Sequence, residues 1–354
     1  MDITNIDELL LMAKGKGASD VHMTVALPAK ARINGTLISL TEDKLTMEKI
    51  KELVTPILNE RTSRILEETG EVDFAYSIPG EGRFRVNVFK QRGTLAAVLR
   101  LVNSIIPSPD KLGVPREVQE LVFKKRGLIL VTGPTGSGKS TTLASMIDRL
   151  NQERNCHIIT LEDPIEYLHS HKAAVINQRE VGADTTSYAG ALRAALREDP
   201  DVILVGEMRD LDTISTAITA AETGHLVLST LHTTGSAATV DRVIDVFPAH
   251  QQPQIRMQFA NVIEGVISQQ LMPNAQGNGR VAAFEVMLGT PAIRNLIRES
   301  KTHQLNGLIQ TSKKQGMELM DDALYTLYCQ GKISKENCVA YAQDAATMQK
   351  RTFA

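Results

Sequence analysis

The feature that most constrains this chain is the segment GPTGSGKS at residues 133–140, which follows an apolar run at residues 128–131. A strand, a glycine-rich turn and a helix starting near Thr141 form the context in which such a segment surrounds the phosphates of a nucleotide. Glycines let backbone N–H groups close around phosphate oxygens, and the helix N-terminus favours negative charge there. The sequence therefore predicts an ATP site.

Two side chains of this segment have specific expected roles. Lys139 is expected to reach the β- and γ-phosphates, and the Ser140 hydroxyl is expected to ligate Mg²⁺. The alternative is a glycine-rich structural turn, and the strand-to-helix context counts against it. The predicted nucleotide-binding residues are Gly133, Pro134, Thr135, Gly136, Ser137, Gly138, Lys139, Ser140 and Thr141.

Apolar runs also occur at residues 157–161, 202–205 and 226–231, between segments with helical spacing. Continuous apolar strands that alternate with helices are typical of a parallel sheet covered on both faces. In such sheets ligands bind at the carboxyl ends of the strands. We therefore examined the residues that follow each run.

An acidic segment, LEDPIE at residues 161–166, lies at the end of the first of these runs. Carboxylates at this position could polarise an attacking water or hold Mg²⁺ through water. Glu162, nearest to the predicted strand end, is our choice for the general base. For Asp163 and Glu166 the alternative is a solvated loop in which Pro164 begins a helix.

The run at residues 202–205 is followed by Gly206 and Glu207. A carboxylate after this strand is expected to reach Mg²⁺ or an ordered water, so Glu207 is a predicted metal ligand together with Ser140.

The run at residues 226–231 has a histidine at each end, His225 and His232. A histidine at a strand end could donate to the γ-phosphate or hold the catalytic carboxylate. His232 is the better candidate because Thr230 and Thr233 flank it. An ordinary structural role stays open for both histidines.

Residues 1–102 have the pattern of a separate α+β domain, with a hairpin turn predicted at Asn34-Gly35. Arginines crowd one β segment of this domain. Arginine is suited to stabilising charge on a transferring phosphoryl group, often across a subunit boundary. The alternative is an exposed, charge-paired sheet face. The arginines are Arg83, Arg85, Arg92 and Arg100.

Residues 103–115 contain three prolines and a glycine, which predicts an interdomain linker. We place the ATPase domain at residues 116–289 and a helical region at residues 290–354. Thr290 as N-cap and Pro291 at the first helical position predict where that region begins.

Composition narrows the class of partner. The formal net charge of −2 over 354 residues provides no general basic field, so nucleic acid is not expected as a main partner. No apolar stretch approaches the roughly 20 residues of a membrane span. The three cysteines fit neither a disulfide framework nor a paired zinc site. We expect a cytoplasmic chain that meets a membrane only through a partner.

Taken in order, GPTGSGKS, LEDPIE, VGEMRD and GHLVLSTLHT resemble the Walker A motif, Asp box, Walker B motif and His box of the secretion ATPase superfamily. GASDVH at residues 17–22 and AIRNLIRE at residues 292–299 are similar to segments of the PilT-type retraction ATPases of type IV pili. The four-cysteine module usual in the related extension ATPases is missing. For AIRNLIRE the alternative is an amphipathic helix, since Ile293, Leu296 and Ile297 share one face.

The resemblance implies a fold and a set of roles. The fold is α/β, with a PAS-like α+β domain followed by a RecA-like P-loop ATPase domain and C-terminal helices. Glu162 would be the catalytic glutamate, Glu207 the Walker B residue and His232 a γ-phosphate contact. Arg85 and Arg100 match family arginines that reach a neighbouring subunit's nucleotide in a homohexamer, and the match of Arg92 is weaker.

The resemblance also implies an activity: a motor that uses ATP and Mg²⁺ to retract the pilus and drive twitching motility. It would act on the pilin filament indirectly, through an inner-membrane platform protein, and would lie at the inner face of the cytoplasmic membrane. Three alternatives stay open. They are a related motor for pilus extension, secretion or DNA uptake, an ATP-binding ring that switches shape without turnover, and a RecA-like DNA motor.

Overall fold

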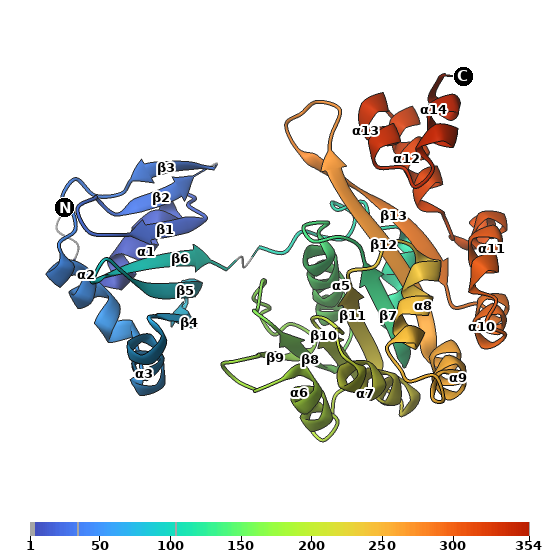
Figure 1. Ribbon diagram of the computed structural model, residues 1–354, viewed down its shortest axis with the longest axis horizontal. Helices are drawn as coiled ribbons and strands as arrows, with labels where there is room; N and C mark the ends of the chain where they lie inside the picture. The colour runs from blue at the N-terminus through green and yellow to red at the C-terminus, as the bar shows by residue number, and fades with distance from the viewer. Residues whose placement is uncertain (1–3, 34, 103–104, 354) are drawn as a thin grey trace. The chain divides into compact units, whose positions relative to one another are not determined.

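The computed structural model of the chain describes residues 4–33, 35–102 and 105–353. These residues form two compact units (Figure 1). The N-terminal unit contains the described residues up to Val102 together with Glu166–Leu168, and the C-terminal unit contains the others, from Ile105 onward. Two residues of the predicted linker, 103 and 104, lie outside the described residues.

The N-terminal unit is a six-stranded antiparallel sheet in the order β3-β2-β1-β6-β5-β4. Helices α1, α2 and α3 pack on it. Its elements are α1 (Ile6–Gly15), β1 (Asp20–Met23), β2 (Lys30–Ile33), β3 (Thr36–Ser39), α2 (Met47–Val54), α3 (Glu60–Thr69), β4 (Glu71–Ile78), β5 (Gly82–Gln91) and β6 (Thr94–Leu101). Ile33 of β2 pairs with Thr36 of β3, and the hairpin turn predicted at Asn34-Gly35 includes Asn34, which lies outside the described residues.

Side chains alternate along β5 in this sheet. Phe84, Val86 and Val88 are buried in one core with Leu9 of α1 and Leu53 of α2. Because successive strand residues face opposite sides, the arginines at positions 83 and 85 lie on the face away from these helices.

The C-terminal unit contains a seven-stranded sheet in the order β13-β12-β7-β11-β10-β8-β9. Neighbouring strands from β12 to β9 are parallel, and β13 is antiparallel to β12. Strands β7, β10 and β11 are buried at every position, as predicted for a sheet covered on both faces. The strands are β7 (Gly127–Thr132), β8 (His157–Glu162), β9 (Val175–Glu180), β10 (Val202–Val205), β11 (Leu226–Leu231), β12 (Ile263–Pro273) and β13 (Arg280–Leu288).

Helices cover both faces of this sheet. On one face Met146 and Leu150 of α5 share a core with Ile129. On the other face Ile218 and Phe259 share a core with Leu128. The helices are α5 (Lys139–Glu153) on the first face and α6 (Tyr188–Ala195), α7 (Leu211–Glu222), α8 (Ser236–Asp245) and α9 (Gln252–Val262) on the second. The predicted α/β fold, with a strand-rich domain followed by a parallel sheet, is confirmed.

Among the described residues, five α-helices follow β13. Thr290 caps the first of them by accepting a 3.3 Å hydrogen bond from the Ile293 N–H, with Pro291 in the first turn, as predicted. The helices are α10 (Pro291–Arg298), α11 (Leu305–Thr311), α12 (Met320–Cys329), α13 (Lys335–Ala340) and α14 (Ala345–Phe353).

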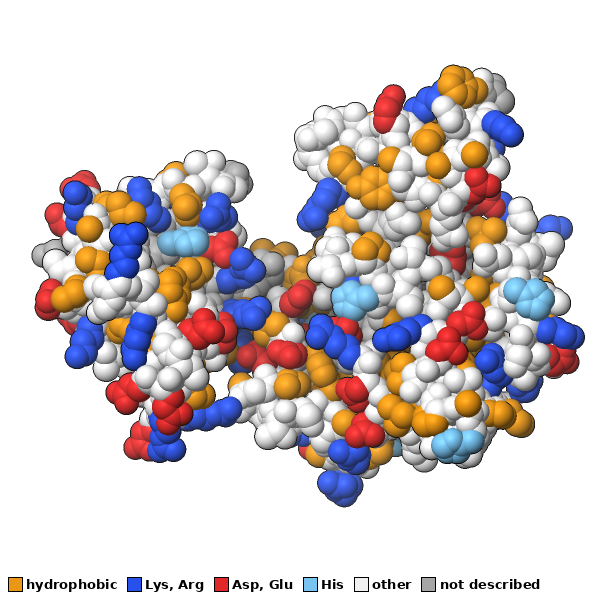
Figure 2. All heavy atoms as spheres, in the orientation of Figure 1, with side chains coloured by type: hydrophobic (Ala, Val, Ile, Leu, Met, Phe, Trp, Pro, Cys, Tyr) orange, Lys and Arg blue, Asp and Glu red, His pale blue; other side chains and the backbone are white. Residues whose placement is uncertain are grey.

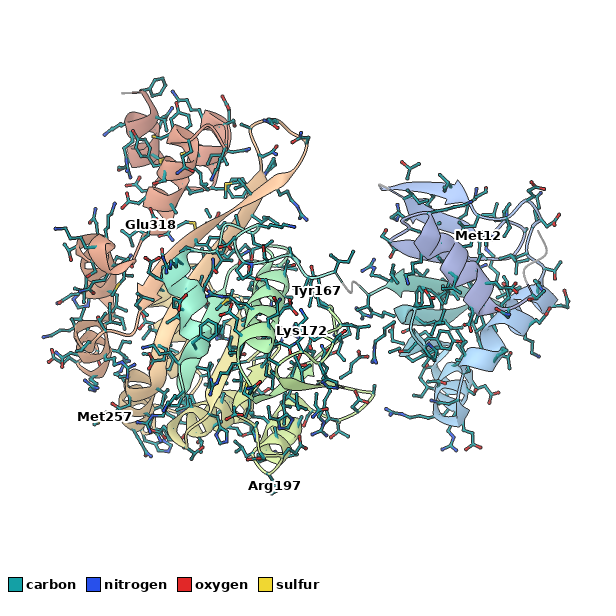
Figure 3. All side chains as sticks on the ribbon, turned by 180° about the vertical axis from the view of Figure 1, so that it is seen from behind. Met12, Tyr167, Lys172, Arg197, Met257 and Glu318 are labelled. Atoms are coloured by element: carbon teal, nitrogen blue, oxygen red, sulfur yellow. The ribbon has the colours of Figure 1, made fainter. Side chains whose placement is uncertain are left out.

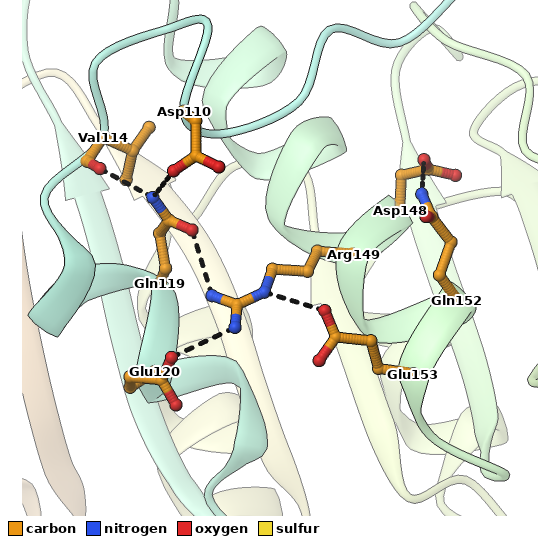
Figure 4. Close-up of polar contacts among 8 residues, drawn as sticks. All are labelled: Asp110, Val114, Gln119, Glu120, Asp148, Arg149, Gln152 and Glu153. Carbon is orange, nitrogen blue, oxygen red and sulfur yellow. Dashed lines mark hydrogen bonds and ion pairs between the residues drawn. The ribbon is translucent and has the colours of Figure 1, made fainter.

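Part of the predicted linker is fastened to α5 (Figure 4). The buried Gln119 of α4 (Arg116–Gln119) donates to Asp110 Oδ1 and to the Val114 carbonyl, both at 2.9 Å. Arg149 of α5 donates to Gln119 Oε1 at 3.0 Å and also pairs with Glu120 at 3.1 Å. The stretch from Asp110 to Val114 is therefore held on the C-terminal unit.

Charges of both signs cover the visible surface of each unit. In Figure 2, Lys and Arg side chains are interspersed with Asp and Glu side chains, in keeping with the small net charge. Among the described residues, no helix combines the length and the apolar character that crossing a bilayer requires.

Candidate functional site

Four adjacent parallel strands bring the predicted site residues to one edge of the sheet. In sheet order, β7 leads into the segment 133–140, β11 into His232, and β10 into Gly206 and Glu207, while β8 ends in Glu162. The carboxyl ends of parallel strands share one edge, which is where open α/β sheets bind ligands.

His225 lies at the opposite edge, because it precedes β11. Its Nδ1 atom contacts the Ala220 carbonyl at 3.0 Å and lies 3.4 Å from the Thr223 hydroxyl. Of the two predicted histidines, only His232 lies at the edge that carries the segment 133–140.

The glycines of this segment hold conformations that other residues rarely adopt. Gly133, Gly136 and Gly138 have φ angles of 138°, 80° and 90°. A Cβ atom on Gly133 would also lie 2.2 Å from the carbonyl oxygen of Gln269. Helix α5 begins at Lys139, two residues earlier than predicted, so the loop passes directly into the helix. This is the shape of a phosphate-binding loop.

Lys139 lies across this loop. Its side chain is buried, and Nζ donates to the carbonyl oxygens of Gly133 and Pro134 at 2.9 and 3.0 Å. Ser140 is exposed and Thr141 partly buried in the first turn of α5. Their contacts with a nucleotide stay predictions.

Gln269 of β12 braces the loop, and it was not predicted. Its Nε2 atom donates to the Ser137 carbonyl at 2.7 Å, and its Oε1 atom accepts from the Thr142 hydroxyl at 2.8 Å. The side chain is almost fully buried, so both contacts are shielded from water. Gln269 thereby joins the loop, α5 and the strand beside β7.

Glu207 is held by two basic side chains. Its Oε1 atom lies 2.7 Å from Arg209 Nε and 3.0 Å from His232 Nε2. Burial raises the pKa of Glu207, but the hydrogen bond from Arg209 and the charge of His232 outweigh burial and lower the pKa below its usual value. Glu207 is therefore ionised at neutral pH.

Glu162 is oriented by two polar neighbours. Its Oε1 atom accepts hydrogen bonds from the Thr160 hydroxyl at 2.6 Å and from Gln178 Nε2 at 3.0 Å. Thr160 lies two residues earlier on the same strand and therefore on the same face. Glu166 belongs to the N-terminal unit, whereas Glu162 belongs to the C-terminal unit.

Tyr188 of α6 reports how the acidic residues gather. Its pKa is raised, first by burial and then by the negative charges of Asp163, Glu207 and Glu162. The two predicted carboxylates, Glu162 and Glu207, therefore both lie near Tyr188, although they follow different strands.

The residues at this edge fit Mg²⁺. Ser140 offers an exposed hydroxyl at the start of α5, and Glu207 offers an ionised carboxylate. Hard oxygen ligands of this kind are the ones Mg²⁺ prefers, with phosphate oxygens and water completing its shell.

The predicted arginines lie in the N-terminal unit, where the sheet places two of them, Arg85 and Arg100, in one row across its strands. In the register of four adjacent strands, Arg85 lies opposite Arg100 and Arg100 lies opposite Asp20. Asp20 in turn lies opposite Arg32. Arg100 Nε donates to Asp20 Oδ1 at 2.7 Å. Burial raises the pKa of Asp20, but hydrogen bonds from Arg100 and Ser19 outweigh burial and lower it.

The row contains two of the predicted arginines and two residues that were not singled out, Asp20 and Arg32. Arg92 lies at the turn after β5, with a φ of 49°, and is outside the row. Arg83 is on β5 and shares the face of Arg85.

Comparison with known proteins gives a consistent result. The family model described as Type II/IV secretion system protein matches residues 3–340. The type IV pilus retraction ATPase PilT of Pseudomonas aeruginosa is 49% identical over 337 residues, which are 95% of this chain and 97% of that protein. A twitching motility protein of Neisseria gonorrhoeae is 47% identical over 317 residues, 90% of this chain and 85% of that protein.

A solved structure agrees with these relatives. The crystal structure of the pilus retraction motor PilT with bound ADP matches with a TM-score of 0.90 and 50% identity, covering 98% of this chain and 99% of that one. With 98% of the chain covered, the match extends over both units. The chain therefore belongs to the family of type II/IV secretion system proteins.

Proposed function

We propose that this chain is an ATP-hydrolysing motor that retracts type IV pili and thereby drives twitching motility. The observation that carries the proposal is the sheet edge at which the phosphate loop, Glu162, Glu207 and His232 meet. Similarity to PilT over nearly the whole chain supports retraction as the work performed.

In this proposal the nucleotide binds through residues 133–141. The backbone N–H groups of the loop and the start of α5 hold the phosphates, and Lys139 exchanges its carbonyl partners for β- and γ-phosphate oxygens. Mg²⁺, held by Ser140 and Glu207, would neutralise charge on the phosphates. Gln269 keeps the loop in shape while the nucleotide is exchanged.

Hydrolysis then uses Glu162 as general base. Glu162, oriented by Thr160 and Gln178, takes a proton from the water that attacks the γ-phosphorus, and the bond to the bridging oxygen of ADP breaks. His232 donates a hydrogen bond to the γ-phosphate, and Glu207 holds its ring in place.

The proposal extends to a homohexamer in which Arg85 and Arg100 of one subunit act on the nucleotide of its neighbour. Arginine supplied across a boundary stabilises charge that develops on the transferring phosphoryl group. Movements of the ring would act on a platform protein of the inner membrane and, through it, on the pilin filament. The chain would be cytoplasmic and peripheral to that membrane, and nucleic acid would not be its main partner.

The decisive experiment compares cells whose single copy carries Lys139→Ala with cells carrying the wild type. Pilus length, surface motility and ATP hydrolysis by the purified chain are measured. Lys172→Ala is the control. Lys172, labelled in Figure 3, lies in the same unit and pairs with Asp148.

Abundant pili without motility, together with lost hydrolysis, are expected for Lys139→Ala alone. Loss of the pili themselves would instead indicate an extension motor, and unchanged cells would indicate another cargo. A Glu162→Gln chain that releases phosphate as fast as the wild type would exclude Glu162 as the base.

A further inference from the structure

One buried carboxylate caps the N-termini of two helices of the C-terminal unit. Glu285 of β13 is 1% exposed. Its Oε1 atom accepts a hydrogen bond from the Ser236 N–H at 2.6 Å, and its Oε2 atom accepts one from the Met320 N–H at 3.3 Å. Ser236 is the first residue of α8 and Met320 the first residue of α12.

These contacts explain how a carboxylate is kept so deep in the protein. A buried charge is costly unless hydrogen bonds and nearby potential compensate it. The first N–H groups of a helix lack partners within the helix, and the N-terminus favours a negative charge. Neither α8 nor α12 has a side-chain cap of its own, so Glu285 serves both.

The first of these helices starts just after His232. The intervening loop is fixed at Gly235, whose N–H donates to the Ser268 hydroxyl at 3.0 Å. Ser268 pairs in register with Thr132 of β7 on one side and with Glu285 on the other. The loop after His232 is therefore attached to β12 and β13, and β12 lies beside β7, which leads into the phosphate loop.

The second helix belongs to the C-terminal helices. Glu318, labelled in Figure 3, exchanges backbone hydrogen bonds with Val286 at 2.8 and 3.1 Å and leads into α12. Gln343, which precedes α14, places Nε2 3.4 Å from Glu285 Oε2. A Cβ atom on Gly235 would lie 3.5 Å from the same Nε2 atom, so the two segments almost touch.

We propose that Glu285 is a positioning residue for the nucleotide site. It joins the loop that carries His232 to helices α12–α14, so that these helices and the contact between His232 and Glu207 move together. This inference rests on the proposed role of His232 in hydrolysis. A movement of the C-terminal helices would thus alter the rate of hydrolysis without a direct contact to nucleotide.

The test uses Glu285→Gln in the full chain. This variant keeps the size of the side chain but can no longer accept both helix N–H groups through a carboxylate. Amide hydrogen exchange is followed in the first turns of α8 and α12, and kcat and KM for ATP are measured separately. Should this variant be recovered unfolded, Glu285→Asp keeps the charge but is too short to span both helices.

The control is Asp322→Asn. Asp322 is also buried, and it pairs with Lys313 at 2.7 Å and Arg351 at 2.9 Å, both within the C-terminal helices. It therefore perturbs α12–α14 without touching the loop after His232.

For the Glu285 variants we expect exchange to rise about tenfold in α8 and α12 together, and kcat to fall about tenfold with KM nearly unchanged. Asp322→Asn leaves both Glu285 contacts in place, so it should speed exchange in the C-terminal helices without raising exchange in the first turn of α8, and it should lower kcat much less than the Glu285 variants do. A Glu285 variant with faster exchange in α12 but wild-type exchange in α8 and wild-type kcat would overturn the inference. A wild-type chain that does not hydrolyse ATP would instead overturn the proposed function.

Discussion

The Nε2 atom of His232 lies 3.0 Å from Oε1 of Glu207, the carboxylate oxygen that Arg209 also approaches. The contact links the ends of two neighbouring strands, β11 and β10. A histidine held in this way keeps one ring orientation, which is what a hydrogen-bond donor aimed at a phosphate requires.

Replacing His232 by Ala should lower kcat for ATP hydrolysis about 10²-fold with only a small change in KM, because the lost donor acts chiefly in the transition state. Steady-state kinetics of the purified chain measure both constants. The matched control is His225→Ala, at the other end of β11, which should keep the wild-type kcat. Equal losses for the two variants would show that His232 acts only through folding.

Replacing Gln269 by Ala should weaken nucleotide binding about tenfold, because the Ser137 carbonyl and the Thr142 hydroxyl lose buried partners and the phosphate loop relaxes. Titration with a fluorescent ATP analogue gives the Kd. Gln270→Ala is the control, since the neighbouring side chain faces the other side of β12. Unchanged Kd for Gln269→Ala would mean that the loop holds its shape without this brace.

His169 should make the stability of the C-terminal unit depend on pH. Burial, opposed by the charge of Asp148, lowers the pKa of His169 from 6.5 to about 4. The unfolded chain therefore binds a proton between these values that the folded chain does not, so stability is full above pH 6.5 and falls as the pH drops toward 4. The loss should reach about 3 kcal/mol.

Denaturant unfolding at a series of pH values measures this dependence. His169→Gln should flatten it, whereas His250→Gln, at an exposed position, should leave it unchanged. A pH dependence that is the same in all three proteins would contradict the role of His169.

Arg294, within the AIRNLIRE segment, should stabilise the position of α10. Its guanidinium donates to the carbonyl oxygens of Gly289 and Asn261 and pairs with Glu264 at 2.7 Å. Removing it leaves a largely buried carboxylate without its closest partner, so Arg294→Ala should cost about 2–4 kcal/mol of unfolding free energy. Thermal melting measures the loss.

Arg298→Ala is the comparison for Arg294. Arg298 donates to the side chain of Asn261 at 3.0 Å, and its replacement should cost much less. Equal melting temperatures for the wild type and Arg294→Ala would show that Arg294 does not stabilise the fold.

Local patterns were enough to predict the elements of the site. A strand followed by glycines and a helix, or an apolar run followed closely by Glu207 or His232, can be recognised without knowing which elements lie beside it in the fold. The shared edge followed from the parallel sheet. The start of α5 was placed two residues late because Lys139 and Ser140 gave no separate helix signal.

Residues that act through tertiary pairing escaped prediction. Gln269 is 127 residues from Thr142 and becomes a brace only because β12 lies beside β7. The polar side chains of β12 and β9 also interrupt the apolar pattern that identified the other strands. Asp20 joins Arg100 only through the register of β1 with β6, which local sequence does not encode.

The two helices that share Glu285 determine how this chain could be recombined with its relatives. A graft that begins at Thr290 would import α12 and Gln343 but keep the host carboxylate, so the foreign helix would start against a partner that it did not evolve with. Moving the junction to the turn before Arg280 transfers β13 together with the helices and preserves those contacts. The C-terminal helices are thus an exchangeable module only when β13 travels with them.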